Sequence, residues 1–267
     1  MLFVLVVLSV FLGYSFAKDK LSEKDSTADS EPKTEILRFV LVADSEDENE
    51  LLAKALSEAR SRTASFVIGL GDWTTIGTLD QLKAVNKVFD ESGLEYYLTA
   101  GDHDLWGSRN SGDLALANYR QIFGDPNREF SRNGIHFLIL DNSDIYSGIK
   151  DAEISNIKNQ ISNKGKLTFV FAHKTPFHPQ SAHVMGEDNA QVASQAKKLM
   201  SVLEEKKVDG FFSGDLHFFA QFNSPGNVVK MTTIGAVSSE RNFQGPRFAI
   251  VKVFSDNSWE VEDVEIR

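Results

Sequence analysis

Residues 66–104 read FVIGLGDWTTIGTLDQLKAVNKVFDESGLEYYLTAGDHD and hold the most regular pattern in the chain. The runs FVIGL at residues 66–70 and YYLT at residues 96–99 are short and apolar, as is typical of buried strands. Leu79–Ser92, between them, has the apolar spacing of an amphipathic helix. Each strand runs into a Gly-Asp pair, Gly71-Asp72 after the first and Gly101-Asp102 after the second. This unit predicts an α/β fold with acidic side chains gathered where the strands end.

The same alternation of apolar runs and amphipathic stretches extends over most of the chain. Further strands are predicted at Ile36–Ala43, Ile135–Leu140, Leu167–Ala172 and Gly210–Ser213. Further helices are predicted at Leu51–Arg60, Leu114–Phe123, Ala152–Ser162 and Asn189–Glu205. After Asp215 we expect antiparallel strands without helices between them, at Phe218–Phe222, Val228–Thr233, Phe248–Phe254 and Trp259–Ile266. These elements predict a two-sheet β-sandwich flanked by helices, in one domain over residues 35–267.

Composition excludes several classes of protein. The chain has 267 residues, of which 42% are hydrophobic and 25% charged, so fibrous, collagen-like and fully disordered proteins are excluded. The net charge of −10 argues against a nucleic-acid-binding surface, because phosphate neutralisation needs Lys and Arg. The absence of cysteine excludes disulfides, thiolate zinc sites and cysteine nucleophiles.

The first 17 residues are apolar and end in small residues at Ser15 and Ala17. This pattern predicts a secretory signal peptide, with a retained membrane anchor as the alternative, since no Lys or Arg precedes Lys18. Either interpretation places the rest of the chain outside the cytoplasm, with membrane contact only if the segment is retained. Residues 18–34, rich in Lys, Asp, Glu and Ser, are expected to be a flexible linker.

Five of the predicted strands end in an aspartate or a histidine. The residues that follow them are Asp44, Asp72, Asp102-His103-Asp104, His173 and Asp215-Leu216-His217. Any one of these has an ordinary explanation, since Gly-Asp pairs such as Gly112-Asp113 also occur in turns. Three of the six histidines stand at these ends, however, and ligand sites form outside the carboxyl ends of strands. Their joint occurrence favours a functional site. For His178 and His183, in the loop after His173, a solvated position is favoured over substrate contact.

The order of these motifs over residues 36–254 resembles the calcineurin-like metallophosphoesterase superfamily. Its pattern is D-x-H, G-D-x-x, G-N-H-D/E, a strand-end H and G-H-x-H. The matching segments are Asp44-Ser45-Glu46, Gly71-Asp72-Trp73-Thr74, Gly101-Asp102-His103-Asp104, His173 and Gly214-Asp215-Leu216-His217. Three positions depart, because Glu46 and Asp215 replace histidines of the pattern and Asp102 replaces its asparagine. The resemblance implies the same two-sheet fold.

The resemblance also implies a site with two divalent metal ions. One ion would be held by Asp44, Glu46, Asp72 and His217, and the other by Asp72, Asp102, His173 and Asp215. Such a site hydrolyses phosphate monoesters or diesters by in-line attack of a bridging hydroxide. By the same resemblance, His103 would protonate the leaving oxygen and Asp104 would orient its imidazole. Arg109 is a candidate phosphate contact, although a solvated surface position is slightly favoured for it.

The three departures make the implied site rich in carboxylates. Two divalent ions would bring +4 against −5 from the carboxylates of Asp44, Glu46, Asp72, Asp102 and Asp215. Anionic ligands weaken the Lewis acidity of the ions that they bind. The sequence therefore favours metal binding more strongly than it favours rapid catalysis. Oxygen ligands suit Mn²⁺, Mg²⁺ or Ca²⁺ better than an imidazole-rich site would, with Fe and Zn²⁺ left open. The alternatives are a catalytically degenerate protein that binds metal or phosphate, and an interaction domain that uses the fold as a scaffold.

Overall fold

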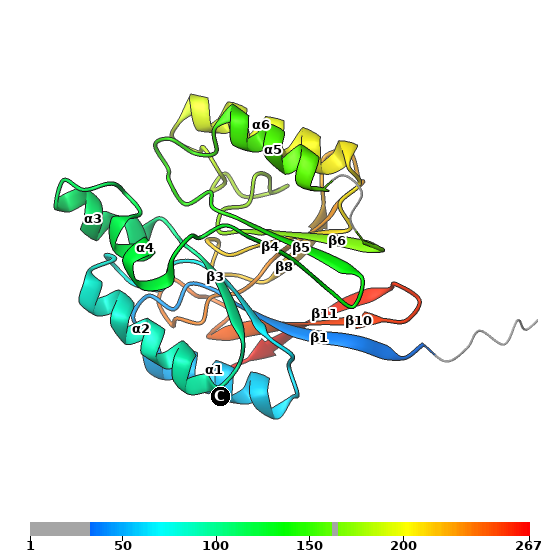
Figure 1. Ribbon diagram of the computed structural model, residues 1–267, viewed down its shortest axis with the longest axis horizontal. Helices are drawn as coiled ribbons and strands as arrows, with labels where there is room; N and C mark the ends of the chain where they lie inside the picture. The colour runs from blue at the N-terminus through cyan, green and yellow to red at the C-terminus, as the bar shows by residue number, and fades with distance from the viewer. Residues whose placement is uncertain (1–32, 162–164) are drawn as a thin grey trace, which may run out of the picture. The chain divides into compact units, whose positions relative to one another are not determined.

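Two β-sheets pack face to face in the computed structural model, which describes residues 33–161 and 165–267 (Figure 1). One sheet has the strand order β11-β10-β1-β2-β3 and the other β4-β5-β6-β7-β9-β8. The strands of the first sheet are β1 (Glu35–Val42), β2 (Val67–Leu70), β3 (Tyr96–Thr99), β10 (Arg247–Phe254) and β11 (Trp259–Glu265). Those of the second are β4 (Arg128–Arg132), β5 (Ile135–Leu140), β6 (Leu167–Ala172), β7 (Gly210–Ser213), β8 (Ala220–Asn223) and β9 (Lys230–Thr233). The predicted two-sheet sandwich is confirmed.

Helices cover the outer face of each sheet (Figure 1). The first sheet is covered by α1 (Asn49–Ser61), α2 (Leu79–Ser92) and α4 (Ala117–Phe123), and the second by α5 (Asp151–Ile161) and α6 (Ala190–Glu205). Local sequence explains the limits of α2, because Thr78 and Gln81 form a capping box at its start and Gly93 ends it with φ 68°. Two short helices, η1 (His103–Leu105) and α3 (Trp106–Asn110), follow β3.

Apolar side chains fill three layers, one between the sheets and one under each set of helices. Strand β1 shows how the sequence achieves this, because Phe39 and Leu41 face the other sheet while Val40 and Val42 face the helices. Strands buried on both faces are therefore continuously apolar, as FVLV is here. The central layer is aromatic, and the Phe39 and Phe66 rings stack with centroids 5.3 Å apart. This core fixes the spacing of the strand ends.

Strand β4 and the polarity of strand β9 differ from the sequence-based expectation. Strand β4 was not predicted, because REFSR alternates exposed polar residues with only one large apolar side chain, Phe130. Strand β9 was expected to be antiparallel to its neighbours, yet it pairs parallel to β7 and antiparallel only to β8. The other late strands do pair antiparallel, β10 with both β1 and β11. Strand polarity follows from the route of the chain between sheets, which local composition does not encode.

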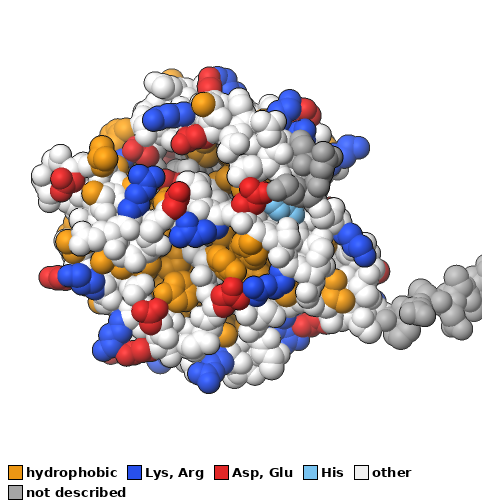
Figure 2. All heavy atoms as spheres, in the orientation of Figure 1, with side chains coloured by type: hydrophobic (Ala, Val, Ile, Leu, Met, Phe, Trp, Pro, Cys, Tyr) orange, Lys and Arg blue, Asp and Glu red, His pale blue; other side chains and the backbone are white. Residues whose placement is uncertain are grey.

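Residues 33–267 form one compact unit. The predicted signal peptide or anchor at residues 1–17 and nearly all of the predicted linker lie outside the described residues. Within the described part, no helix is both long enough and apolar enough to cross a membrane. On the face drawn in Figure 2, acidic and basic side chains are interspersed and hydrophobic side chains gather near the centre.

Candidate metal centre

The turns after β1, β2, β3, β6 and β7 meet at one edge of the sandwich. Backbone hydrogen bonds join these turns, from Asp44 N to the Gly71 carbonyl at 2.9 Å and from Gly214 N to the His173 carbonyl at 3.0 Å. The turns pack closely, since a Cβ atom at Gly101 would lie 2.0 Å from Asp72 Oδ1. Glycine therefore precedes Asp102 for a steric reason, and the turns hold their side chains in one place.

Five of the candidate ligands adopt left-handed backbone conformations that non-glycine residues seldom take. Their φ angles are 53° at Asp44, 43° at Glu46, 53° at Asp72, 66° at Asp215 and 56° at His217. Each such residue costs about 1–2 kcal/mol relative to ordinary helical or extended backbone. Strain of this kind persists where the surroundings over-determine the backbone, and it concentrates at functional sites. No sequence motif predicted these backbone conformations.

Asp72, Asp102, His173 and Asp215 form a buried four-residue group whose ligand atoms all lie within 4.8 Å of one another. The Nε2 atom of His173 lies 3.4 Å from Asp72 Oδ2, 3.3 Å from Asp102 Oδ1 and 3.5 Å from Asp215 Oδ1. Among the described residues, His173 Nε2, Asp102 Oδ1 and Asp215 Oδ2 are buried without a well-aligned hydrogen bond. Three carboxylates and an imidazole converging in this way are a donor set suited to a divalent cation.

A second group lies on the other side of Asp72. Ligand atoms of Glu46, Asp72 and His103 lie within 4.8 Å of one another, and His217 Nε2 lies 3.7 Å from Glu46 Oε1. Glu46 Oε2 is buried and has no hydrogen-bond partner among the described residues. Asp44 is fully buried and accepts hydrogen bonds from Asp215 N at 3.1 and 3.2 Å. The structure thus brings together all seven residues for which the resemblance implied a metal-binding role.

The three strand-end histidines share one hydrogen-bonding arrangement. In each, Nδ1 faces a backbone carbonyl, which can only accept, so Nδ1 carries a proton and Nε2 is the nitrogen that can offer a lone pair to an ion. The pairs are His103 with Thr75 at 3.1 Å, His173 with Leu70 at 2.7 Å and His217 with Glu240 at 3.2 Å. Metal-binding histidines typically have their second nitrogen held in this way. The residues present therefore fit divalent metal.

Three cationic side chains that the sequence reasoning did not assign to the site also reach it. Lys174 Nζ lies 2.5 Å from Asp215 Oδ1 and 2.9 Å from Asp102 Oδ1. Arg241 Nη2 lies 2.6 Å from Glu46 Oε1, and His183 Nε2 lies 3.4 Å from Asp215 Oδ1. The only sequence signal for Lys174 is its position next to His173. Arg241 has none, because it is 195 residues from its partner.

Burial and these cations set the protonation of the centre. Burial raises the pKa of the Asp44 carboxyl to about 7, although His217 and His173 lower it. Burial also opposes ionisation of Asp102 and Asp215, yet the adjacent His173 and Lys174 hold the pKa of Asp102 below its ordinary value and that of Asp215 well below. The pKa of His173 is correspondingly raised, because the surrounding carboxylates outweigh its burial. The chain's own cations balance much of the charge on this side.

The structure gives Asp104 and Arg109 partners other than those expected. Asp104 is fully buried and accepts hydrogen bonds from backbone and hydroxyl groups of neighbouring turns, while the His103 imidazole pairs with Thr75 and stacks on Trp106 at 4.4 Å. The expectation that Asp104 orients His103 is therefore wrong. The Arg109 guanidinium lies 2.8 Å from Asp144 and 4.9 Å from the centre of the Tyr146 ring. Arg109 thus ties α3 to the turn after β5.

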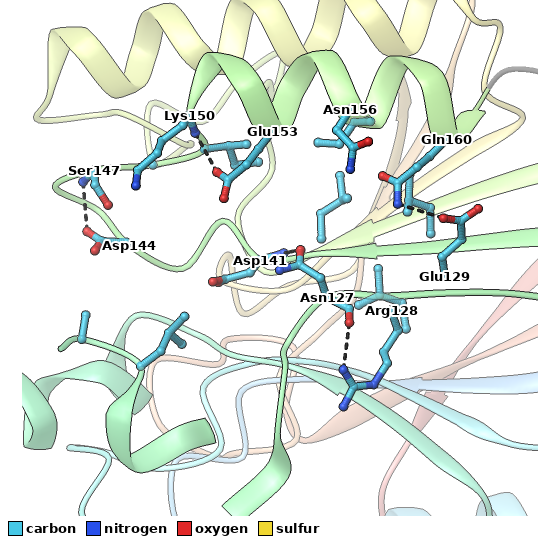
Figure 3. A pocket seen from close by; sticks show the side chains of 18 of the residues that line it. Asn127, Arg128, Glu129, Asp141, Asp144, Ser147, Lys150, Glu153, Asn156 and Gln160 are labelled. Atoms are coloured by element: carbon cyan, nitrogen blue, oxygen red, sulfur yellow. Dashed lines mark hydrogen bonds between the residues drawn. The ribbon is translucent and has the colours of Figure 1, made fainter. Parts of the chain in front are cut away.

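A separate cavity of about 540 Å³ lies between α4, β4, β5 and α5 (Figure 3). Its lining contains none of the candidate ligands. Several of its polar side chains are paired with each other or with neighbouring backbone, such as Gln160 with Glu129 and Arg128 with the Asn127 carbonyl. Asp141 also lines it, and both Ser143 N and Ser143 Oγ donate to Asp141. The metal centre and this cavity are distinct features.

Comparison with known proteins gives a family match and several structural relatives. The model of the calcineurin-like phosphoesterase family matches residues 37–219. No curated protein sequence matches the chain. Purple acid phosphatase PPD1 from yellow lupin seeds superposes with a TM-score of 0.67 at 13% identity, over 86% of this chain and 51% of that one. The chain thus spans about half of the length of that phosphatase.

Two further solved structures share the fold. GAP50, the anchor in the inner membrane complex of Plasmodium, superposes with a TM-score of 0.59 at 15% identity, over 86% of this chain and 89% of that one. TT1561 of Thermus thermophilus superposes with a TM-score of 0.55 at 11% identity, over 88% of this chain and all of that one. At these identities the likeness concerns the fold alone.

Proposed function

Because the chain belongs to the calcineurin-like phosphoesterase family, we propose that it hydrolyses phosphate esters using divalent metal bound at the Asp and His cluster. The observation that carries the proposal is the shared arrangement of His103, His173 and His217. In each, Nδ1 donates to a backbone carbonyl, and in His173 and His217 the Nε2 atom lies beside carboxylates of the cluster. A site used only for packing has no need to fix three imidazoles in one tautomer.

The residues on both sides of Asp72 would hold the metal. On one side these are Asp102, His173 and Asp215, and on the other Glu46 and His217, with Asp44 beneath them. A bound divalent ion would supply Lewis acidity toward phosphoryl oxygens and lower the pKa of water. The strained turns keep the carboxylates in place without rearrangement on binding.

His103 is the residue placed to act on the leaving group. Its Nδ1 is used by Thr75 and its ring is fixed by stacking on Trp106, so Nε2 is the atom left to exchange a proton. Protonated Nε2 would donate to the ester oxygen as the bond to phosphorus breaks. The ring is half-buried, so a substrate reaching it from solvent would pass close to Trp106, which is 38% exposed.

The test is a hydrolysis assay on the purified full chain. Protein stripped of metal with a chelator is supplied in turn with Mn²⁺, Mg²⁺, Ca²⁺, Fe²⁺ and Zn²⁺, and offered aryl and alkyl phosphate monoesters and diesters. We expect hydrolysis that depends on the ion and is lost in Asp72→Asn, because Asp72 belongs to both ligand groups. Asp113→Asn, which changes an exposed Gly-Asp aspartate elsewhere, is the matched control. No hydrolysis with any ion and substrate would contradict the proposal.

A second function is favoured by the cations in the centre. Lys174 and Arg241 each pair with a carboxylate that the resemblance assigns to metal, which suits a protein that binds metal or phosphate without turnover. GAP50 of the same fold is named for anchoring. Binding of Mn²⁺ or inorganic phosphate measured by calorimetry, in the absence of any hydrolysis, would favour this function over catalysis.

We also propose that the protein works outside the cytoplasm. The support is the apolar run over residues 1–17 with Ser15 and Ala17 before Lys18. Cell fractionation with N-terminal sequencing tests this. A mature chain beginning near Lys18 in an extracytoplasmic fraction is expected, and an intact chain in the soluble cytoplasm would contradict it.

A further inference from the structure

Lys174 is built into the centre rather than placed at its edge. The residue is 6% exposed, and Asn142 brackets its backbone on both sides. The Lys174 amide donates to Asn142 Oδ1 at 2.9 Å, and Asn142 Nδ2 donates to the Lys174 carbonyl at 2.6 Å. Asn142 is itself buried, so this clamp is not open to solvent competition. The side chain that starts from this fixed backbone ends between Asp102 and Asp215.

The ammonium group uses the oxygen atoms that a metal ion would need. Asp102 Oδ1 and Asp215 Oδ1, which face His173 Nε2 at 3.3 and 3.5 Å, are the same two atoms that Lys174 Nζ contacts at 2.9 and 2.5 Å. A divalent ion bound to both oxygens would lie within a few ångströms of Nζ, where two cations repel strongly in a buried environment. Lys174 therefore competes with an ion for Asp102 and Asp215, two of the four residues in this group.

The two cations of the centre differ in how easily they can leave their carboxylates. The five carboxylates of the centre carry −5 when ionised, and Lys174 and Arg241 bring this to −3. The Lys174 side chain is buried and starts from a backbone held by Asn142, whereas the Arg241 side chain is 59% exposed and can turn into solvent. The Glu46 side of Asp72 is thus the side that can open to an ion.

We propose that Lys174 is a tethered cation that takes the place of the second divalent ion, so that the protein holds a single ion, on the Glu46 side of Asp72. The inference rests on the metal binding in the proposed function and departs from the two-ion site that the resemblance implies. The ligands left for the single ion are Glu46, Asp72 and the Nε2 atom of His217.

Metal stoichiometry tests the inference without using activity. The full chain is stripped of metal and titrated with Mn²⁺ by calorimetry, and the metal content is measured after gel filtration. We expect one ion per wild-type chain, two per chain in Lys174→Met, which removes the charge and keeps the length, and one in Lys174→Arg, which keeps the charge. Two ions in the wild type, one in Lys174→Met or two in Lys174→Arg would overturn it.

Electron paramagnetic resonance on the wild type keeps the inference testable if Lys174→Met does not fold. A single Mn²⁺ gives the resolved hyperfine signal of an isolated ion, whereas two ions sharing Asp72 would give a broadened, exchange-coupled spectrum. The same measurements, combined with the hydrolysis assay, distinguish a failure of this inference from a failure of the proposed function. Two coupled ions with hydrolysis would overturn this inference and leave the proposed function standing. One ion without hydrolysis would support the inference and contradict the proposed function, and no bound ion would overturn both.

Discussion

Asp104 Oδ1 accepts two hydrogen bonds from Thr74, one from its backbone N–H at 3.1 Å and one from its hydroxyl at 3.0 Å. The other oxygen, Oδ2, accepts from Gly101 N at 2.9 Å and Trp73 N at 3.3 Å. This carboxyl thus ties the turn after β3 to the turn after β2, the two turns that present Asp102 and Asp72. Burial and the charge of Asp72 raise the pKa of Asp104 to about 7. Its role is to position the turns.

Replacing Asp104 should therefore reduce stability. Asp104→Ala leaves four buried donors without an acceptor, and we expect a loss of about 3 kcal/mol or more in the free energy of unfolding. Urea denaturation measures the loss. Asp113→Ala, which removes an exposed aspartate that also follows a glycine, should change stability by less than about 0.5 kcal/mol. Equal effects of the two substitutions would show that the hydrogen bonds of Asp104 contribute little.

His103→Ala should slow hydrolysis without releasing metal, if its imidazole acts on the leaving group. We expect a decrease of about 10²–10⁴-fold for alkyl phosphates, whose leaving oxygen needs a proton, and a smaller one for aryl phosphates. Rates are compared alongside the metal content of each protein. Since His103 also lies within ligand distance of Glu46 and Asp72, loss of metal together with activity would identify it as a ligand instead.

Metal removal should destabilise the fold. A bound ion relieves repulsion among the clustered carboxylates and stabilises the folded state by mass action. Stripping metal-loaded protein with EDTA should lower the melting temperature, measured by differential scanning calorimetry. In Asp72→Asn, which weakens both ligand groups, EDTA should have no such effect. An unchanged melting temperature in protein verified to be metal-loaded would speak against a stabilising ion.

His217→Gln should weaken Mn²⁺ binding. His217 Nε2 lies 3.7 Å from Glu46 Oε1, with Nδ1 held by the Glu240 carbonyl, so the substitution removes a nitrogen already oriented for an ion. Losing only a supporting partner of a ligand typically reduces affinity 10–100-fold, and loss of the ligand should do at least as much. The matched control is His136→Gln, which changes a buried histidine in β5 outside the cluster. Equal affinities in both variants would remove His217 from the ligand set.

Asp141→Asn should stabilise the protein above acidic pH. Burial raises the pKa of Asp141, so the folded state binds a proton more tightly than the unfolded state does. A raised carboxyl pKa means that stability falls as the pH rises from the unfolded value of about 3.9 through the folded one. The asparagine does not titrate and still offers an oxygen to Ser143. The melting temperature of the variant minus that of the wild type should increase between pH 4 and pH 8, and a constant difference would contradict this.

The spacing of apolar residues predicted most helices and strands, because the burial of one or both faces of an element is reflected in its own local sequence. The predicted limits of β3, β5, β6, β7 and α2 agree with the structure to the residue. Helix α4 begins at Ala117, three residues after the expected start, because residues 114–116 form a turn. The spacing of Asp44, Asp72, Asp102, His173 and Asp215 behind their strands sufficed to bring them to one edge, since strand ends meet wherever strands lie side by side.

The tertiary structure decided which cations pair with the carboxylates at that edge of the sandwich. Lys174 and Asp215, or Arg241 and Glu46, are distant in sequence, and no sequence pattern pairs either cation with its carboxylate. Whether a cation meets a carboxylate depends on how far apart the two sheets pack and how each turn bends. Those distances are set by the aromatic layer between the sheets and by left-handed turns at the strand ends. The order of strands, helices and strand-end residues in the sequence therefore predicted the two-sheet fold and the candidate ligand positions, and three-dimensional packing determined which charges lie beside those residues.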